Sequence, residues 1–324
     1  MKEYKKIKSL LEQGKISYTR IIKLAGDASD RKFFRILSPN KSYVFLLYPG
    51  PFDKNLNLLS AHKLYSSAHL PVPKIINVWL EQGALLLQDL GNMSLQRYSK
   101  IINSEERKNI YFQAINLIQK IQIEAGKNLN SSYFASHHKL DKEKLLWELN
   151  FFLENYIQNF LKKQITSGLR DKYENEFNAL LDLIDFRKMV LCHRDYHSRN
   201  LFIVDHKIFL VDYQDSRLGP PLYDLASLLF DSYLKIEKKL KKELIQYAYS
   251  LNNYGWNKDE YFSQLILTSL QRNIKALGTF GYQISIKKRK RYLSYIPRTL
   301  KYIQENVKYF SPLKSLERLM KDWV

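Results

Sequence analysis

The spacing of apolar residues changes once along this chain, close to Gly91, and that change limits the folds open to it. Between residues 18 and 92 the apolar residues gather in short β-rich runs, separated by turn formers such as Gly, Pro, Asn and Asp. Beyond Gly91 the spacing becomes helical, and only residues 189–213 interrupt it. The chain is therefore predicted to be α+β, with a small sheet lobe followed by a larger helical lobe.

Five strands and one helix are expected in the sheet lobe. The strands are predicted in YTRIIKLA, KFFRIL, SYVFLLY, KIINVW and ALLLQDL, and the helix between Asn55 and His69. Later helices are predicted near 104–125, 140–165 and 170–184, and again from Leu222 onward. We place the lobe boundary between 1–91 and 92–324, with Leu87–Gly91 as a short connector.

The interruption at 189–213 carries the motif LCHRDYHSRN, residues 191–200, followed twelve residues later by Asp212 in IFLVDYQD. Phosphoryl transfer from ATP needs a carboxylate beside the attacking hydroxyl and oxygen ligands that hold Mg²⁺ against the phosphates. Asp195 is the candidate for the first role, and Asn200 and Asp212 are candidates for the second. The alternative is an ordinary loop and hairpin whose Asp and Asn residues form turns, which requires several positions to match by accident.

The motif resembles the catalytic loop of protein kinases, but His197 stands two residues after the carboxylate, where protein kinases usually carry Lys. H-x-D-x-H-x-x-N is instead the pattern of the aminoglycoside phosphotransferase superfamily, whose members phosphorylate small molecules. Other segments resemble the branch with bacterial anomeric N-acetylmuramate/N-acetylglucosamine kinases of cell-wall recycling. They are GDASDRKFFRI, LLLQDLG, VDYQDSRLGPPLYDLASLL, QRNIKALGTFGYQ and YIPRTLKYI. The resemblance covers most of the chain and implies a protein-kinase-like bilobal fold.

The resemblance also implies residue roles. Asp195 would be the catalytic carboxylate, with ATP and Mg²⁺ as cofactors, and His197 would shape the loop or face the phosphoryl group. A zinc-ligand role for His197 fails, because no second His or Cys lies at a metal-binding interval. His193 is expected to brace the loop by hydrogen bonding. Asp224 lies in the first turn of a predicted helix, where it would cap that helix or hold the catalytic loop.

The predicted phosphate loop, residues 25–30, joins two strands through small residues, and Ser29 is its preferred side-chain contact. An ordinary polar hairpin turn would explain the same residues. The third strand, SYVFLLYPGP, lacks the lysine that protein kinases and most aminoglycoside phosphotransferases place there, and the next helix lacks the partner glutamate. The resemblance implies that this absence is a family trait. It leaves Arg31, Lys32 and Arg35 as candidates for the phosphate-binding cation.

The segment Gln88, Asp89 and Leu90 follows an apolar strand and takes the position of an adenine-facing hinge. Its backbone groups would hydrogen-bond the base, with Leu87 and Leu90 packed nearby. A simple strand-to-helix turn is the alternative.

The acceptor is expected to bind the helical lobe, where residues 231–324 carry 19 Lys and Arg against 8 Asp and Glu, a difference of +11. A site for polycationic aminoglycosides needs clustered carboxylates, so a neutral or anionic sugar is favoured. Arg272, Lys275 or Arg298 would suit the lactyl carboxylate of N-acetylmuramate. Gln214 and Asp215 would reach substrate hydroxyls or serve the loop.

Composition restricts the compartment and the partners. The formal charge of +20 is spread over nearly every segment, which indicates compositional bias and predicts no nucleic-acid partner. One cysteine, Cys192, excludes an intrachain disulfide framework and is expected as a small buried hydrophobe. No signal-like or membrane-length apolar stretch is present, so we expect a cytoplasmic protein without membrane contact. Oligomeric state is not predicted.

The sequence therefore predicts an ATP- and Mg²⁺-dependent small-molecule kinase, acting on the anomeric hydroxyl of N-acetylmuramate or N-acetylglucosamine. One alternative is the same reaction on another hydroxyl compound, such as an aminoglycoside or an amino alcohol. The other is a nucleotide-binding regulatory protein without transfer activity. That reading would explain the missing lysine, but gives no reason for Asp195, Asn200 and Asp212 to occur together.

Overall fold

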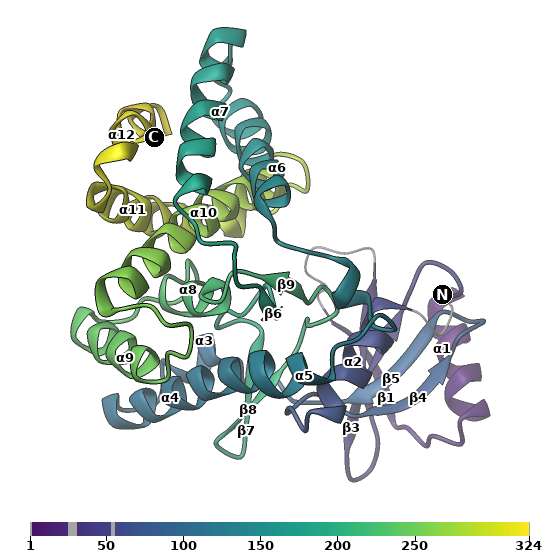
Figure 1. Cartoon of the computed structure of the whole chain (residues 1–324). Helices are drawn as coiled ribbons and strands as arrows, with labels where there is room; N and C mark the ends of the chain where they lie inside the picture. Colours follow the sequence, from purple (N-terminus) through teal and green to yellow (C-terminus); the bar gives the residue numbers. More distant parts are fainter. Residues whose placement is uncertain (1, 25–30, 53–55, 324) are drawn as a thin grey trace.

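The computed structural model describes residues 2–24, 31–52 and 56–323, which form a sheet lobe and a larger helical lobe (Figure 1). The sheet is antiparallel, with strand order β1-β2-β3-β5-β4. Its strands are β1 (Arg20–Leu24), β2 (Lys32–Leu37), β3 (Ser42–Leu47), β4 (Ile75–Trp79) and β5 (Ala84–Gln88). Each of the five predicted runs contains one of these strands, and α2 (Asn57–Ser67) lies within the predicted helix.

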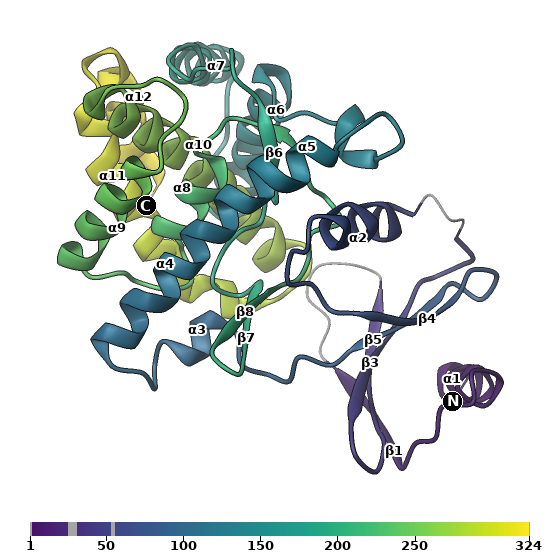
Figure 2. The same ribbon diagram turned by 60° about the horizontal axis from the view of Figure 1, so that its bottom comes forward.

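One face of the sheet is covered by α1 (Lys2–Gln13), a helix that the sequence analysis did not predict. Ile7 and Leu11 are buried there against Phe34 and Phe45, which are paired across β2 and β3. Figure 2 shows α1 on the side of the sheet that faces away from the helical lobe. The sheet therefore has an apolar core of its own on this face.

On the other side, α2 lies between the sheet and the helical lobe (Figure 2). The Tyr65 hydroxyl is 2.8 Å from Ser216 Oγ, and His62 Nδ1 is 3.0 Å from the Tyr213 hydroxyl. The Tyr65 and Tyr213 rings stack with centroids 5.2 Å apart. The sheet lobe thus packs directly on the segment that follows Asp212.

Local sequence signals explain where the helices of the larger lobe begin. Asn103 and Asp141 accept backbone hydrogen bonds at the starts of α4 and α6, and Asn257 forms a capping box with Glu260 at the start of α10. The helices are α3 (Leu95–Tyr98), α4 (Ser104–Lys120), α5 (Gly126–Asn128), α6 (Lys142–Phe152), α7 (Ser167–Asp182), α8 (Tyr223–Leu229), α9 (Lys238–Ser250), α10 (Lys258–Ser285), α11 (Ile296–Asn306) and α12 (Lys314–Leu319). Helices α4 and α6 continue as π-helical turns over Ile121–Ala125 and Leu153–Phe160, matching the longer predicted stretches.

Two glycines let α10 cross very close to α6 and its π-helical continuation. A Cβ atom at Gly278 would lie 2.7 Å from the Cα of Phe152, and one at Gly281 would lie 2.3 Å from the carbonyl oxygen of Asn155. Side chains at these positions would force the helices apart, so glycine is needed for the close approach. The crossing fixes where the preceding turns of α10 present their side chains.

Two short antiparallel pairs carry the predicted motif. Strand β6 (Val190–Cys192) pairs with β9 (Arg217–Gly219), and β7 (Leu201–Val204) pairs with β8 (Lys207–Leu210). Residues 193–200 and 211–216 are the loops that leave these strands. Cys192 is buried at the end of β6, as predicted, and burial raises the pKa of its thiol.

Between the lobes, β5 ends at Gln88 and α3 begins at Leu95. The division at residue 91 lies within this connection and stays a prediction. Over the ranges that the structure describes, no helix combines the length and the apolar character that a membrane crossing requires.

Candidate active site

Asp224 holds the start of the 193–200 loop from the first turn of α8. Its carboxylate is fully buried and accepts hydrogen bonds from the backbone N–H groups of His193, at 2.7 Å, and Arg194, at 3.0 Å. Burial raises the pKa of Asp224, while His193 and the two N–H groups oppose the rise. His193 Nε2 also donates to the carbonyl of Val211 at 3.1 Å, which ties this loop to the residue before Asp212.

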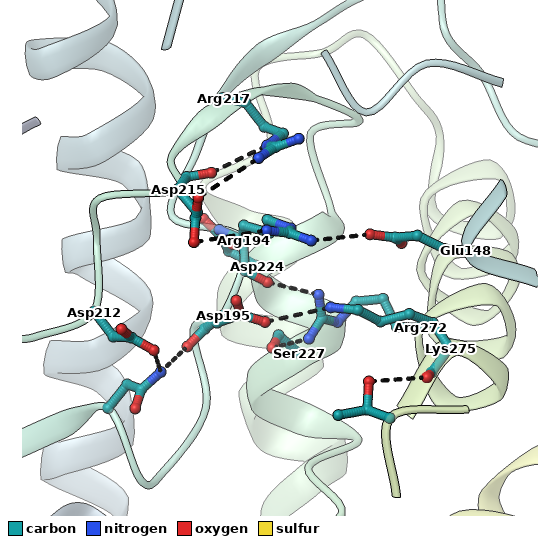
Figure 3. A network of polar contacts seen from close by, with 12 residues as sticks. Glu148, Arg194, Asp195, Asp212, Asp215, Arg217, Asp224, Ser227, Arg272 and Lys275 are labelled. Carbon is teal, nitrogen blue, oxygen red and sulfur yellow. Dashed lines mark hydrogen bonds and ion pairs between the residues drawn. The ribbon is translucent and has the colours of Figure 1, made fainter. Parts of the chain in front are cut away.

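Arg194 and Asp212 both have backbones in the left-handed region, with φ of 80° and 65°. Such conformations are strained for residues other than glycine and persist where surrounding contacts fix them. For Arg194 these contacts are the Asp224 carboxylate on its N–H and Arg272 Nη1, which donates to its carbonyl at 2.7 Å. The Arg194 guanidinium lies 3.3 Å from Glu148 (Figure 3). The loop backbone is therefore held from both sides.

Asp195 points toward Lys275 of α10, whose Nζ lies 3.4 Å from Asp195 Oδ1 (Figure 3). Burial would raise the pKa of the Asp195 carboxyl, but the charges of Lys275 and Arg194 outweigh burial and lower it. Asp195 is therefore ionised at neutral pH. With 28% of its side-chain surface exposed, it remains accessible to a bound hydroxyl.

Asn200 connects this carboxylate with Asp212. Its Nδ2 donates to the backbone oxygen of Asp195 at 3.0 Å and lies 3.4 Å from Asp212 Oδ2. Gln214 Nε2 donates to the other Asp212 oxygen at 2.8 Å. These contacts, made by the amide nitrogen of Asn200, place its side chain beside the carboxylate of Asp212, and the oxygen of the same amide is the atom that would bind a shared cation.

The donor chemistry of this pair fits Mg²⁺. Enclosure by the surrounding protein raises the pKa of Asp212, with Gln214 opposing and Asp195 adding to the rise, although 45% of its side chain still faces the cleft. A divalent cation would compensate this carboxylate. Within the described residues no group of three or more His, Cys, Asp or Glu side chains is arranged to hold a metal. An Mg²⁺ ion here would take its other ligands from phosphate oxygens and water, as this cation commonly does.

A cleft of about 610 Å³ opens between the lobes beside Asp212. Its walls combine apolar side chains of the sheet with residues of the helical lobe, the arrangement that suits a planar base with a charged tail. The apolar lining includes Leu24, Val44, Leu46, Leu87, Leu90 and Phe202. Ser29 and the rest of the predicted phosphate loop lie outside the described residues.

The three candidate phosphate cations have different surroundings. Lys32 pairs with Glu3 of α1, on the far side of the sheet. Arg35 is bound to Asp89, with Nε 2.6 Å from Oδ2, and also donates to the carbonyl of Gly91. Arg31 lines the cleft, and its Nη2 lies 3.7 Å from Asp212 Oδ1. Only Arg31 among these three is adjacent to the candidate metal ligands.

The predicted hinge lines the same cleft through Gln88, Asp89 and Leu90. The Asp89 carboxylate is engaged by Arg35 and accepts the backbone N–H of Gly91 at 2.9 Å, so this side chain shapes the turn. Gln88 binds back to the sheet lobe, its Oε1 accepting from the N–H of Lys74 at 3.3 Å.

A second, smaller hollow of about 190 Å³ lies on the other side of Asp195 and Asp212. Part of its wall is aromatic, formed by Tyr233, Phe280 and Tyr292. The Arg199 guanidinium lies over two of these rings, 4.8 Å from the centroid of Tyr233 and 5.9 Å from that of Tyr292. His197 also lines the hollow, and burial lowers its pKa to about 3, so its ring is neutral at physiological pH.

The five predicted acceptor residues are not equally placed to touch a substrate. Gln214 binds Asp212, and Asp215 lies between Arg194 and Arg217, 3.9 Å from each. Arg272 borders the hollow, but is 9% exposed and donates to Arg194 and, at 2.6 Å, to Ser227 Oγ. Arg298 donates to the carbonyl of Ser232, behind the hollow wall. Lys275 faces the hollow beside Asp195.

Several residues of the site were missed in the sequence. Glu148 is buried within α6 and binds Arg194, and a single acid inside an apolar helical run was the available signal. Asp231 accepts the backbone N–H of Ser198 at 2.9 Å and follows Asp224 by seven residues. Arg199 lies within the motif itself, directly before Asn200. The aromatic wall had no sequence signal, because its members come from separate segments: Tyr233 from the connection between α8 and α9, Phe280 from α10, and Tyr292 from the 3-10 turn after α10.

Comparison with known proteins agrees with this geometry. The Phosphotransferase enzyme family (APH) matches residues 20–257. The chain is 26% identical over 307 residues to the N-acetylmuramate/N-acetylglucosamine kinase of Neisseria meningitidis serogroup B, covering 93% of this chain and 89% of that protein. It is 28% identical over 297 residues to the protein of the same name from Pseudomonas putida, covering 90% and 85%.

Solved structures show the same fold at low sequence identity. Aminoglycoside phosphotransferase APH(2'')-Ib with ADP bound superposes with a TM-score of 0.63 at 14% identity, covering 93% of this chain and 97% of that one. Choline kinase LicA from Streptococcus pneumoniae gives 0.61 at 13% identity, covering 94% and 100%. These likenesses confirm the predicted kinase-like bilobal α+β fold. With the family match over residues 20–257, they show that the chain belongs to the phosphotransferase enzyme family.

Proposed function

We propose that this protein transfers the γ-phosphoryl group of MgATP to the anomeric hydroxyl of N-acetylmuramate or N-acetylglucosamine. The observation that carries the proposal is the position of Asp195, which lines the aromatic-walled hollow and is tied through Asn200 to Asp212, a residue that lines both the hollow and the interlobe cleft. A nucleotide in the cleft and a sugar in the hollow would meet at this carboxylate. The names of the curated relatives support the choice of sugar.

In this proposal Asp195 orients the sugar hydroxyl and receives its proton as the new O–P bond forms. Because phosphoryl transfer passes through a loose transition state, positioning and charge stabilisation contribute more than early deprotonation. A carboxylate with a lowered pKa is a weak base but a firm hydrogen-bond acceptor, which suits this role. Asn200 and Asp212 would hold Mg²⁺, which draws charge from the phosphates when bound.

Arg31 is our candidate for the cation that replaces the missing third-strand lysine. Its guanidinium already lies 3.7 Å from the Asp212 carboxylate, so phosphates bound to a cation at Asp212 would come within its reach. Guanidinium groups suit this role because they bind phosphate oxygens through two N–H groups at once. Lys32 and Arg35 would serve the sheet lobe through Glu3 and Asp89.

Arg199 would select the sugar. Its guanidinium lies over the rings of Tyr233 and Tyr292 in the lining of the hollow and would pair with the lactyl carboxylate of N-acetylmuramate. An aromatic box for a quaternary ammonium would need open ring faces. Here a guanidinium covers them, which argues against choline as the acceptor.

The test is turnover of purified protein with MgATP against N-acetylglucosamine, N-acetylmuramate, kanamycin and choline. The 1-O-methyl glycoside of N-acetylglucosamine is the matched control, because only its anomeric oxygen is blocked. We expect both free N-acetyl sugars to react, the methyl glycoside to be inert, and the product to be acid-labile, as a glycosyl phosphate is. Turnover of the methyl glycoside would refute the anomeric assignment. A larger kcat/KM for kanamycin or choline would refute the sugar.

A further inference from the structure

The amine of Lys275 and the carboxylate of Asp195 meet in the lining of the acceptor-side hollow. The two residues are 80 positions apart, and their 3.4 Å contact is made possible by the close crossing of α10. The Lys275 side chain keeps 16% of its surface exposed. An ammonium has three N–H donors. Within the described residues, the Lys275 amine makes one hydrogen bond, to Asp195. The amine therefore has further N–H donors for a ligand.

The position of an acceptor hydroxyl follows from that of Asp195. To transfer its proton, the hydroxyl has to lie within about 2.6–3.2 Å of the carboxylate. Phosphorus then bonds to the same hydroxyl oxygen, so the group in transfer passes close to whatever touches Asp195. Lys275 already touches it. Of the candidate metal ligands, Asn200 lines the hollow and Asp212 lines both the hollow and the nucleotide cleft, whereas Lys275 lines the hollow and not the cleft. Lys275 therefore approaches the transferred group from the sugar side.

The local charges are balanced before any phosphate arrives. Glu148 is 1% exposed and binds Arg194 at 3.3 Å and Gln271 at 3.2 Å. Together Glu148 and Asp195 offset the charges of Arg194 and Lys275 (Figure 3). Of the two cations, Arg194 is held by Glu148 and Asp215, whereas Lys275 faces the hollow.

Other groups near Asp195 are less suited to meet a phosphoryl group from this side. His197 is neutral at physiological pH. Arg272 is only 9% exposed, and its hydrogen bonds to the Arg194 carbonyl and Ser227 Oγ hold its guanidinium in place beside the hollow. A loose transition state places negative charge on the three equatorial phosphoryl oxygens, which a mobile cation can follow.

We propose that Lys275 is a catalytic residue that binds the phosphoryl group in transfer from the sugar side. The proposal rests on the proposed function. As the Pγ–O bond to ADP breaks and the bond to the acceptor oxygen forms, Lys275 exchanges its Asp195 contact for an equatorial phosphoryl oxygen. Asp195 is thereby released to accept the hydroxyl proton, and Lys275 keeps its own protons throughout. The same amine would thus hold Asp195 ionised at rest and stabilise the transition state.

The experiment compares Lys275→Met, which keeps the length and removes the charge, with Lys275→Arg, which keeps the charge. Lys301→Met, an exposed lysine of α11, is the matched control. We expect Lys275→Met to lower kcat by about 10²–10³-fold, the usual effect of losing one transition-state contact. The Kd for ADP and the KM for N-acetylglucosamine should change less than threefold. Lys275→Arg should recover at least tenfold of the lost rate, and Lys301→Met should match the wild type.

A second measurement separates a phosphoryl contact from an effect exerted only through Asp195. ADP, aluminium fluoride and N-acetylglucosamine bound together imitate the phosphoryl group in transfer. Lys275→Met should lower the affinity for this combination at least tenfold more than it lowers the affinity for ADP alone. The loss should persist when Asp195 is already Asn. Equal analogue affinity in Asp195→Asn with and without Lys275→Met would overturn the proposal. So would an unchanged kcat, or a raised sugar KM at constant kcat, in a variant whose thermal unfolding shows that it is folded.

A failure of the proposed function would be distinguished from a failure of the Lys275 proposal, because the wild-type protein itself would then not phosphorylate the N-acetyl sugars. If the wild type phosphorylates a different hydroxyl compound, the same variants are compared on that acceptor. If it phosphorylates none, they are compared on hydrolysis of ATP by water, which transfers the same phosphoryl group. Equal rates for the wild type and Lys275→Met in that reaction would overturn the role of Lys275.

Discussion

Two opposing effects act on the pKa of Asp195. Burial favours its neutral form, and the charges of Lys275 and Arg194 favour its ionised form and prevail. We predict that Asp195→Asn, which keeps the shape and removes the charge, lowers kcat by roughly 10²–10⁴-fold. ATP affinity should stay within threefold of the wild type, since the carboxylate faces the acceptor. Turnover at saturating ATP and sugar, paired with nucleotide titration, measures both. A loss below threefold would exclude Asp195 as the proton acceptor.

His197 gives the site a pH-dependent stability. Its folded-state pKa of about 3 lies below the unfolded value near 6.5, mainly because of burial, so the folded state binds fewer protons in that interval. Stability is therefore lost as pH falls from 6.5 toward 3. One such group accounts for at most about 2 kcal/mol between pH 6.5 and 5, at 1.36 kcal/mol per pH unit. Partial exposure of the ring reduces this value.

We accordingly predict that His197→Gln loses less stability than the wild type between pH 7.5 and 5. The substitution removes no hydrogen bond of Nδ1, which is buried without a partner in the described structure. Urea unfolding at the two pH values gives the comparison, and His137→Gln, at an exposed histidine, is the control. If His197→Gln and the wild type lose equal stability on acidification, His197 is not the titrating group.

At the level of single residues, the sequence predicts the functional groups that lie at fixed intervals within a short motif. It does not predict the groups that tertiary packing places beside that motif. Asp195, Asn200 and Asp212 were found because one strand-loop-strand unit sets their separation. Arg272 and Arg298 could be named as cations of the helical lobe, but their contacts with Ser227 of α8 and Ser232, after α8, depend on how α10 and α11 pack in the folded lobe. The sequence does not indicate these partners.

At the level of the element, α10 is the helix that brings Lys275 and Arg272 to the loop. Gly281 sits where a Cβ would lie 2.3 Å from the carbonyl oxygen of Asn155, and a backbone atom cannot turn aside as a side chain does. We predict that Gly281→Ala destabilises the protein by about 1–3 kcal/mol, the usual effect of overpacking, and lowers kcat by displacing Lys275. Urea unfolding and turnover measure these effects.

The control for this change is Gly168→Ala, in the first turn of α7, where an added Cβ meets no atom within 4 Å. There the better helix propensity of alanine should leave stability unchanged or slightly raised. Equal stability of the two variants would mean that the close crossing of α10 does not require glycine at 281.

Elements were predicted well where period and turn chemistry agree. The five sheet strands are short apolar runs rich in β-branched, aromatic and leucine residues, and turn formers such as Gly, Pro, Asn and Asp separate them, so their positions could be predicted directly. Helix α1 was missed, although its buried residues Ile7, Leu10 and Leu11 have helical spacing, because the segment is short and rich in lysine and glutamate. Such a pattern indicates an amphipathic helix, but it does not indicate which surface the apolar side of that helix packs against. Only the folded sheet supplies the partner.

For the whole molecule, net charge is a poor guide to the site. The chain carries +20, yet the described residues that line the acceptor-side hollow and are charged at neutral pH are three carboxylates, of Asp195, Asp212 and Asp231, and three cations, of Arg199, Arg272 and Lys275. The basic surplus of residues 231–324 lies largely outside the hollow. Electrostatic attraction of an anionic sugar must therefore come from individual groups such as Arg199, and not from a uniformly positive pocket.

The same balance leads to a prediction about polycations. Each carboxylate of the hollow already has a partner: Asp195 has Lys275, Asp212 has Asn200 and Gln214, and Asp231 accepts backbone N–H groups of Ser198 and Tyr233. An aminoglycoside would have to displace these partners and would place its ammonium groups beside Arg199 and Lys275, where like charges repel.

We expect kcat/KM for kanamycin to be at least 10³-fold below that for N-acetylglucosamine. Raising the salt concentration should narrow the gap, because screening weakens repulsion between partly exposed charges. Arg199→Met should narrow it further, by removing one of the repelling cations, while lowering the preference for N-acetylmuramate over N-acetylglucosamine. The measurement is kcat/KM for the three compounds at two salt concentrations in both proteins. A kanamycin value that equals or exceeds the N-acetylglucosamine value would show that the hollow presents free carboxylates to its substrate, contrary to the contacts that these groups make.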